Sequence, residues 1–262
     1  GFDSVWTITR ILWPLKPQSA YSGTSDGTLP IEYQNVLDPL DALVYVAANT
    51  STIKLGTSVI DMFYYTPIML AKRLATLDNL SQGRIICGLG LGWSKDEYQA
   101  SNIPFMNRGE RADEFIQVLK KIWTDDIVED PPKPFQKPHI PIYLGGFSSN
   151  TFSRIVKQDL NGWLGVIHGP LVQLQDSKNA IKQYADQVNK DSKFQTIVLS
   201  YSNIENDSPT NDRFPLTGTI DEVGRDIQRI KDMGVDHIVF GYNFVPTGRD
   251  MDKMISLSKE LS

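Results

Sequence analysis

Two glycine-rich segments carry the strongest chemical signals in this sequence. Residues 88–92 alternate glycine with leucine and precede Trp93, and Gly145 and Gly146 follow the run Pro-Ile-Tyr-Leu. Glycine has no Cβ, so the backbone at such a turn can approach a flat or phosphorylated ligand closely. Relief of crowding in a strand, or an ordinary helix start, could also explain them. Residues 88–93 are not a dinucleotide fingerprint, because Trp93 stands where the third glycine is required.

Among the three histidines, His168 is the candidate functional residue. It follows the apolar run 162–166 by two residues, at the end of a strand where active-site groups gather in α/β folds. His139 and His237 are expected to be structural. The sequence contains no histidine or cysteine spacing typical of a metal site and no Gly-x-Ser-x-Gly nucleophile turn. We therefore expect no metal and a bound organic cofactor that performs the chemistry.

These residues are expected to be positioned by a parallel sheet. Short apolar runs alternate with segments of helical spacing along the whole chain, which is typical of strands covered by helices. The seven runs are residues 4–8, 52–59, 84–92, 141–145, 162–166, 195–202 and 237–242. The pattern fits a (β/α)8 barrel or a doubly wound open sheet, and both place active-site residues in the loops after the strands. We predict a single domain over residues 1–262.

Capping residues mark several helix starts. Asp38 and Thr66 each precede a proline, which predicts an N-cap followed by proline at the first helical position. Thr219 and Glu222 form a capping-box pattern, and Gly234 is expected to end the same helix.

The clearest helical pattern covers residues 108–123, where apolar side chains recur at spacings of three and four. The proline-rich residues 125–137 are expected to form an irregular excursion or a lid.

Composition and charge narrow the possible partners. The 262 residues are 40% hydrophobic, enough for a sizeable core. The net charge of −5 and the scattered basic residues argue against nucleic acid, and no apolar run approaches the roughly 20 residues of a membrane helix. Because Cys87 cannot form an internal disulfide, we expect a reducing, cytoplasmic location. The expected partner is a small-molecule substrate.

A series of motifs in fixed order resembles the luciferase-like monooxygenase superfamily, above all its branch of deazaflavin-dependent (coenzyme F420) oxidoreductases. The motifs are residues 55–59, 67, 71–78, 80–84, 88–93, 97–98, 108–114, 123–124, 141–146 and 162–163. The resemblance is strong over residues 1–163 and weak beyond them. It implies a (β/α)8 barrel with the cofactor across the carboxyl ends of the strands, and a homodimer.

The resemblance also implies roles for individual residues. A non-prolyl cis peptide supports the cofactor ring in this family, and Ser58 and Val59 match its position. The cofactor-binding residues are expected to be Ser58, Val59, Asp61, Gly90, Gly92, Trp93, Gly145 and Gly146. Arg10 and His168 are the expected catalytic residues on the substrate side, with Trp13, Tyr201 and Tyr242 around the substrate.

Two positions depart from the family pattern. Thr9 and Arg10 stand where many relatives have an Asp-His or Asp-Arg pair, and Trp93 replaces the catalytic glutamate of sugar-phosphate dehydrogenases. Oxidation of a sugar phosphate is therefore not expected, and the proton donor must come from elsewhere because arginine is a poor acid. Hydride transfer with F420 is the leading hypothesis. The alternatives are an FMN-dependent monooxygenase, supplied with reduced flavin by a partner reductase, and a cofactor-binding relative without turnover.

The resemblance places the family's first strand and helix before residue 1. A barrel needs eight strands and the chain shows seven runs, so this barrel is expected to lack its first strand and helix. We expect the native polypeptide to be longer at its N-terminus by roughly 20 to 30 residues.

Overall fold

The computed structural model describes residues 1–124, 133–191, 193–205, 213–242 and 250–260. The chain divides into two compact units. The N-terminal unit consists of Ser4–Gly145 and Lys157–Asn161, and the C-terminal unit of Gly1–Asp3, Gly146–Val156 and Gly162–Ser262. A single domain over residues 1–262 stays a prediction. Among the described residues, no helix has both the length and the apolar character needed to cross a membrane.

The N-terminal unit is built on parallel strands in the order β1-β2-β4-β5. Their bounds are Ser4–Thr7, Lys54–Thr57, Ile85–Gly90 and Ile142–Gly145. The four runs predicted in this part of the chain are therefore strands. A short strand that the sequence did not predict, β3 (Ile60–Asp61), pairs with the end of β4 and sets Asp61 opposite Gly90.

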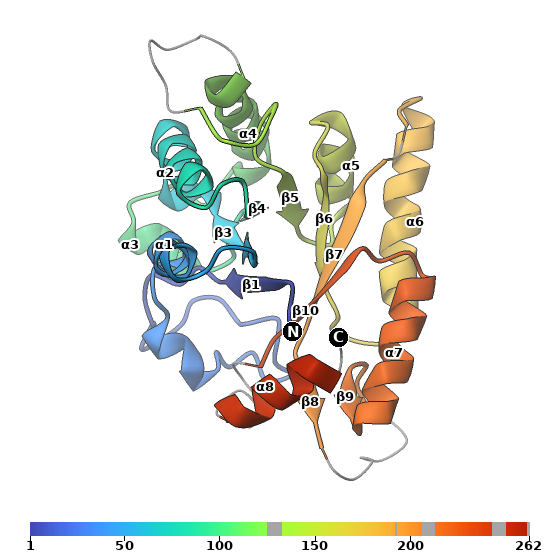
Figure 1. The fold of residues 1–262 in the computed structure, drawn as a ribbon. Coiled ribbons are helices and arrows are strands. Elements are labelled where there is room, and N and C mark those ends of the chain that lie inside the picture. The colour runs from blue at the N-terminus through green and yellow to red at the C-terminus, as the bar shows by residue number, and fades with distance from the viewer. Residues whose placement is uncertain (125–132, 192, 206–212, 243–249, 261–262) are drawn as a thin grey trace. The chain divides into compact units, whose positions relative to one another are not determined.

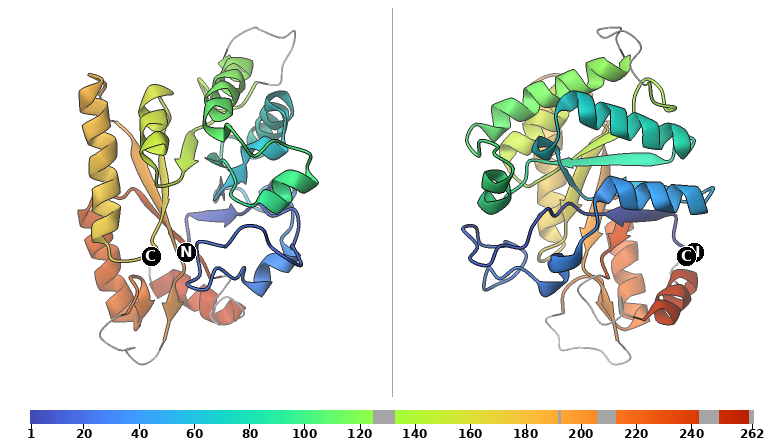
Figure 2. Two further views of the ribbon diagram at one scale, coloured as in Figure 1. Left: turned by 180° about the vertical axis from the view of Figure 1, so that it is seen from behind. Right: turned by 90° about the vertical axis from the view of Figure 1, so that its left-hand side faces the viewer.

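Helices α1, α2 and α4 lie side by side against these strands (Figure 2, right). The helical elements of the unit are η1 (Ile31–Asn35), α1 (Pro39–Asn49), η2 (Met62–Tyr64), α2 (Pro67–Leu80), α3 (Lys95–Ala100) and α4 (Arg108–Thr124). The predicted caps are present, because the Asp38 side chain accepts bonds from two amides of α1 and Thr66 accepts one from the Met69 amide.

Helix α4 confirms the predicted amphipathic pattern. Its apolar residues are buried, namely Ala112, Phe115, Ile116, Leu119, Ile122 and Trp123. The Trp123 indole donates to the Ala71 carbonyl oxygen of α2 at 3.1 Å, which fixes the two helices together. Of the predicted irregular segment, residues 125–132 lie outside the described residues, and residues 133–137 form neither helix nor strand.

The C-terminal unit has a second set of parallel strands, in which β7 lies between β6 and β10. The strands are β6 (Gly162–Val166), β7 (Gln195–Ser200) and β10 (His237–Phe240), which confirms the last three predicted runs. A separate two-stranded pair consists of β8 (Asn203–Ile204) and β9 (Thr217–Gly218). The helices are α5 (Ser149–Lys157), α6 (Val172–Gln187), α7 (Ile220–Asp232) and α8 (Met251–Glu260), drawn in Figure 1.

The predicted capping box begins helix α7. The Thr219 hydroxyl accepts a bond from the Glu222 amide, and the Glu222 carboxylate accepts one from the Thr219 amide. Gly234 follows the helix with φ of +71°, as its predicted role at the helix end requires.

Replacing Thr219 with alanine should lower the free energy of unfolding by about 1 kcal/mol, because the first-turn amides lose an acceptor. Denaturation in urea measures this loss. Thr219→Ser keeps the hydroxyl and should retain most of the stability. Equal losses in the two variants would show that the hydroxyl contributes nothing to α7.

Candidate active site

The end of β2 is held by the end of β1. The Ser58–Val59 peptide is cis, as the resemblance implied. The Ser58 amide donates to the Thr7 carbonyl oxygen at 2.7 Å, and the Thr9 hydroxyl donates to the Val59 carbonyl oxygen at 2.9 Å. The same hydroxyl accepts a longer bond, 3.4 Å, from the Asp61 amide. Thr9, noted in the sequence only as a departure from the family pattern, therefore positions this turn.

The glycines at the end of β4 leave no room for side chains. A Cβ on Gly90 would lie 2.3 Å from Cγ2 of Val59 and 3.2 Å from Oδ1 of Asp61. A Cβ on Gly92 would lie 3.0 Å from the Tyr98 ring and 3.2 Å from Oδ2 of Asp61, and its φ of +71° also favours glycine. Val59 and the Asp61 carboxyl group thus pack directly on the backbone of the glycine-rich turn.

A buried ion pair lies beside this turn. The Nε atom of Arg10 is 3.3 Å from Oε1 of Glu97, and the two side chains are 4% and 0% exposed. The Glu97 carboxylate also accepts bonds from the Ile11 amide at 2.9 Å and the Tyr64 hydroxyl at 3.0 Å. Arg10 Nε forms no hydrogen bond within the described structure, because its contact with Glu97 lacks hydrogen-bond geometry. The negative charge of Glu97 is therefore compensated by the Arg10 charge and by two hydrogen-bond donors.

Asp61 is a buried carboxyl group in a different electrostatic environment. Burial raises the pKa of Asp61 to about 7, and the charge of Glu97 acts in the same direction. Arg10, the Gly92 amide and Arg108 oppose this rise without cancelling it. Burial is also the main reason that the pKa of Tyr64 is raised. Near neutral pH, the Asp61 carboxyl group can therefore gain or lose a proton.

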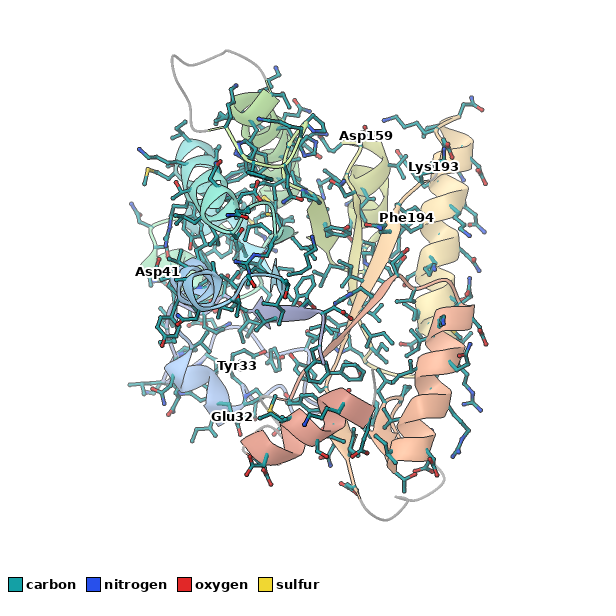
Figure 3. The ribbon with its side chains drawn as sticks, in the orientation of Figure 1. Glu32, Tyr33, Asp41, Asp159, Lys193 and Phe194 are labelled. Carbon is teal, nitrogen blue, oxygen red and sulfur yellow. The ribbon has the colours of Figure 1, made fainter. Side chains whose placement is uncertain are left out.

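Aromatic rings cover the guanidinium group of Arg10. Its central carbon lies 5.1 Å from the centre of the Trp93 ring and 5.7 Å from that of Tyr33, which is labelled in Figure 3. Tyr21 packs on Trp93 with 5.4 Å between ring centres, and its hydroxyl lies 3.0 Å from the Tyr33 hydroxyl. The segment between β1 and α1 thus contributes two tyrosines to a wall that shields the Arg10 charge from water.

The structure brings most of the predicted site residues together within the N-terminal unit. These are Arg10, Ser58, Val59, Asp61, Gly90, Gly92 and Trp93. Gly145 ends β5, the strand next to β4. Among the described residues, no group of three or more His, Cys, Asp or Glu is arranged to hold a metal ion.

Gly146 and His168 belong to the C-terminal unit. Gly146 has φ of +129° and accepts a bond from the Trp163 indole at 2.8 Å. The His168 ring packs 5.6 Å from the Phe147 ring, and burial lowers the pKa of His168. His168 is therefore favoured in its neutral form, able to accept or donate one hydrogen bond at each nitrogen.

Sequence reasoning did not assign Glu97 and Tyr64 to the site. Glu97 was noted only within a family motif. A local signal for the position of Glu97 exists, because Ser94 caps α3 and accepts a bond from the Glu97 amide. The Glu97 carboxylate, however, turns to Arg10, a contact between residues far apart in the sequence.

Comparison with known proteins identifies the family. Residues 1–211 match the family described as luciferase-like monooxygenase. The chain belongs to the luciferase-like monooxygenase family. An uncharacterised protein of Mycobacterium tuberculosis is 32% identical over 194 residues, which are 67% of this chain and 68% of that protein.

Two curated relatives of this luciferase-like protein carry functional names. The FMNH(2)-dependent dimethylsulfone monooxygenase of Pseudomonas putida is 37% identical over 99 residues, 32% of this chain and 27% of that enzyme. The F420-dependent glucose-6-phosphate dehydrogenase of Amycolatopsis mediterranei is 30% identical over 132 residues, 49% of this chain and 35% of that enzyme. The family thus includes oxidoreductases and monooxygenases that depend on F420 or on FMN.

Solved structures show the fold of this luciferase-like protein. Monooxygenase RslO1 from Streptomyces bottropensis has a TM-score of 0.79 and 20% identity, covering 99% of this chain and 88% of that chain. The coenzyme F420-dependent tetrahydromethanopterin reductase of Methanopyrus kandleri has a TM-score of 0.73 and 19% identity, and the match covers 98% of this chain and 89% of that chain. These likenesses establish the predicted α/β barrel class.

Proposed function

We propose that this protein is an oxidoreductase that transfers a hydride between coenzyme F420 and a small organic substrate. The observation that carries the proposal is the close packing of Val59 on Gly90, where β4 ends without side chains. A flat ring can stack on the half-buried Val59 side chain, which the Gly90 backbone supports from behind. The F420-dependent relative, which matches about half of this chain, supports the choice of F420, although an FMNH(2)-dependent relative also matches part of the chain.

The residues present fit a planar, acceptor-rich ring. Val59 and the glycines at positions 90 and 92 provide the surface described above. Arg10 provides a buried N–H donor, its Nε, that forms no hydrogen bond in the described structure. Ring carbonyl groups are acceptors that such a donor could satisfy. We propose that these residues, with Ser58, Asp61, Trp93 and Gly145, hold the cofactor, while the role of Gly146 stays a prediction.

When bound, the cofactor would supply or accept the hydride. The protein would contribute position and electrostatics. Val59 and Gly90 would set the plane of the ring, and Thr9 would keep Val59 in place through its bond to the Val59 carbonyl oxygen. Trp93, packed on Arg10, would keep water from the buried charges. We propose that His168, favoured as neutral imidazole, binds the substrate by a hydrogen bond.

A fluorescence titration of the purified, cofactor-free protein with F420 tests this proposal. We expect saturable binding of F420, and binding of FMN at least about tenfold weaker, a preference of about 1.4 kcal/mol. Tight FMN binding without affinity for F420 would overturn the proposal. That outcome would favour the FMN-dependent monooxygenase, a reading supported by the dimethylsulfone monooxygenase relative.

A further inference from the structure

Two buried carboxyl groups at the proposed cofactor site differ in what compensates their charge. Glu97 has Arg10 at ion-pair distance and two further hydrogen-bond donors, from Ile11 and Tyr64. Asp61, only 7% exposed, forms no ion pair with any described residue. Burial without an ionic partner raises the pKa of Asp61, so this carboxyl group can exchange a proton near neutral pH.

The Asp61 carboxyl group also has the position that proton exchange with a ligand requires. It follows Val59 by two residues, and its two oxygens lie 3.2 Å from the positions that Cβ atoms on Gly90 and Gly92 would take. A ligand stacked on Val59 at this turn would therefore lie beside Asp61. Glu97, by contrast, has both carboxylate oxygens engaged by the protein.

We infer that Asp61 is the acid–base residue of this site, facing the bound ligand and exchanging the proton that accompanies hydride transfer. The inference rests on the proposed function, which supplies the hydride. It assigns the proton donor that the sequence lacked, since Trp93 replaces the family's catalytic glutamate. Glu97 already compensates the positive charge of Arg10, so Arg10 offers no free charge to bind an anionic substrate. The substrate class is therefore an uncharged compound with a polarised carbonyl group, or the corresponding alcohol.

The atoms and electrons of the step balance. In reduction, the carbonyl carbon of the substrate would accept a hydride, with its electron pair, from a C–H bond of the reduced cofactor, and the π bond to oxygen would break. The oxygen takes the proton of Asp61, which leaves a carboxylate that water reprotonates. In the reverse direction the Asp61 carboxylate would accept the alcohol proton, and the oxidised cofactor, when bound, would supply the hydride acceptor.

The charged and titratable groups around Asp61 come from four elements. Arg10 follows β1, Tyr64 lies in η2, Glu97 and Tyr98 lie in α3, and Arg108 begins α4. Both cations have other contacts, because Arg10 pairs with Glu97, and Arg108 donates to the Gly92 carbonyl oxygen at 2.6 Å and stacks 3.5 Å from the centre of the Phe105 ring. Ionised Asp61 would therefore add a negative charge beside the ligand that Arg10, Arg108 and the Gly92 amide compensate only in part.

The test compares F420 affinity at pH 5.5 to 8.5 in the wild type, Asp61→Asn and Asp78→Asn. We expect wild-type affinity to fall by roughly tenfold as pH rises, because ionised Asp61 would repel the anionic cofactor. Asp61→Asn should remove the fall in affinity that ionisation of Asp61 causes, leaving only the effect of the titration of F420 itself, which all variants share.

Asp78 is a matched control, since it is fully buried on α2 and accepts two bonds from Gln136. Asp78→Asn should lower stability and keep the wild-type pH profile.

A second measurement needs no cofactor. Because the pKa of Asp61 is raised to about 7 in the folded protein, the folded state binds more protons than the unfolded state between about pH 4 and 7. The Asp61 contribution to stability is therefore present at low pH and lost as pH rises through about 7. Thermal unfolding of the cofactor-free protein should show this loss in the wild type and in Asp78→Asn, and lack it in Asp61→Asn.

The outcomes separate the two proposals. If wild type binds F420 and Asp61→Asn flattens both pH profiles, the inference stands. If wild type binds F420 and Asp61→Asn keeps either wild-type profile, Asp61 is not the acid–base residue, while the proposed function survives. If wild type does not bind F420, the proposed function fails and the inference fails with it.

Discussion

Replacing Arg10 with methionine should lower the free energy of unfolding by about 3 to 5 kcal/mol at pH 8. The Arg10 side chain is 4% exposed, and its partner Glu97 is fully buried. Methionine keeps much of the apolar volume but leaves the Glu97 carboxylate with two neutral donors, Ile11 and Tyr64. A buried charge without its ionic partner is one of the few changes that costs this much.

The loss should depend on pH. Removing Arg10 removes a charge that holds the pKa of Asp61 down, so Asp61 will take up a proton more readily. Protonation relieves the uncompensated negative charge, and the destabilisation should therefore be larger at pH 8 than at pH 5. Urea denaturation at the two pH values measures both stabilities.

The double variant Arg10→Met with Glu97→Gln decides whether the ion pair is the cause. Removing both charges should restore most of the lost stability, because a buried pair can often be replaced as a unit at little cost. Arg73→Met is the exposed control. Arg73 pairs with Asp38 and Asp41 near the surface, so its loss should cost no more than about 1 kcal/mol. If Arg10→Met costs as little as Arg73→Met, the pair with Glu97 contributes nothing to stability.

Local signals explain why most of the fold was predictable from the sequence. A buried strand such as β6 is a run of adjacent apolar residues, and a cap such as Thr219 acts within three residues of its partner. The short strands β3, β8 and β9 were not predicted, because two residues are too few to show a period. Their pairing depends on segments that only the fold brings together.

The site was predictable where a motif marks it and not where a long-range pair builds it. The glycines at positions 90 and 92 are visible in the sequence because glycine spacing is distinctive. Arg10 was predicted to lie on the substrate side. No residue near Arg10 in the sequence indicates that it pairs with Glu97, which lies in α3. The proton donor was missing for the same reason, since the environment of Asp61 depends on Glu97, Arg10 and Arg108. Burial and charge at such a position are properties of the fold.

Gly90→Ala should strongly weaken F420 binding and lower stability, because its methyl group would displace Val59. The new methyl group would lie 2.3 Å from Cγ2 of Val59, so Val59 must move away from β4. Overpacking of this kind costs about 1 to 3 kcal/mol of stability. Because Val59 would form the surface under the ring, its displacement should also cost affinity, on the order of 100-fold if the stacking is lost. Fluorescence titration and thermal unfolding measure the two effects separately.

Two further glycine variants separate a damaged site from a damaged fold. A Cβ on Gly56 of β2 would lie 2.3 Å from the Trp6 ring, so Gly56→Ala introduces a comparable clash against a residue with no proposed contact to the cofactor. Gly224 lies within α7 with open space around it, and Gly224→Ala should raise stability by up to about 1 kcal/mol. We expect Gly56→Ala to lose stability and keep F420 affinity, and Gly90→Ala to lose both. Equal losses of F420 affinity in Gly56→Ala and Gly90→Ala would mean that Val59 and Gly90 do not contact the cofactor. Destabilisation of the strands would then explain the loss of affinity in both variants.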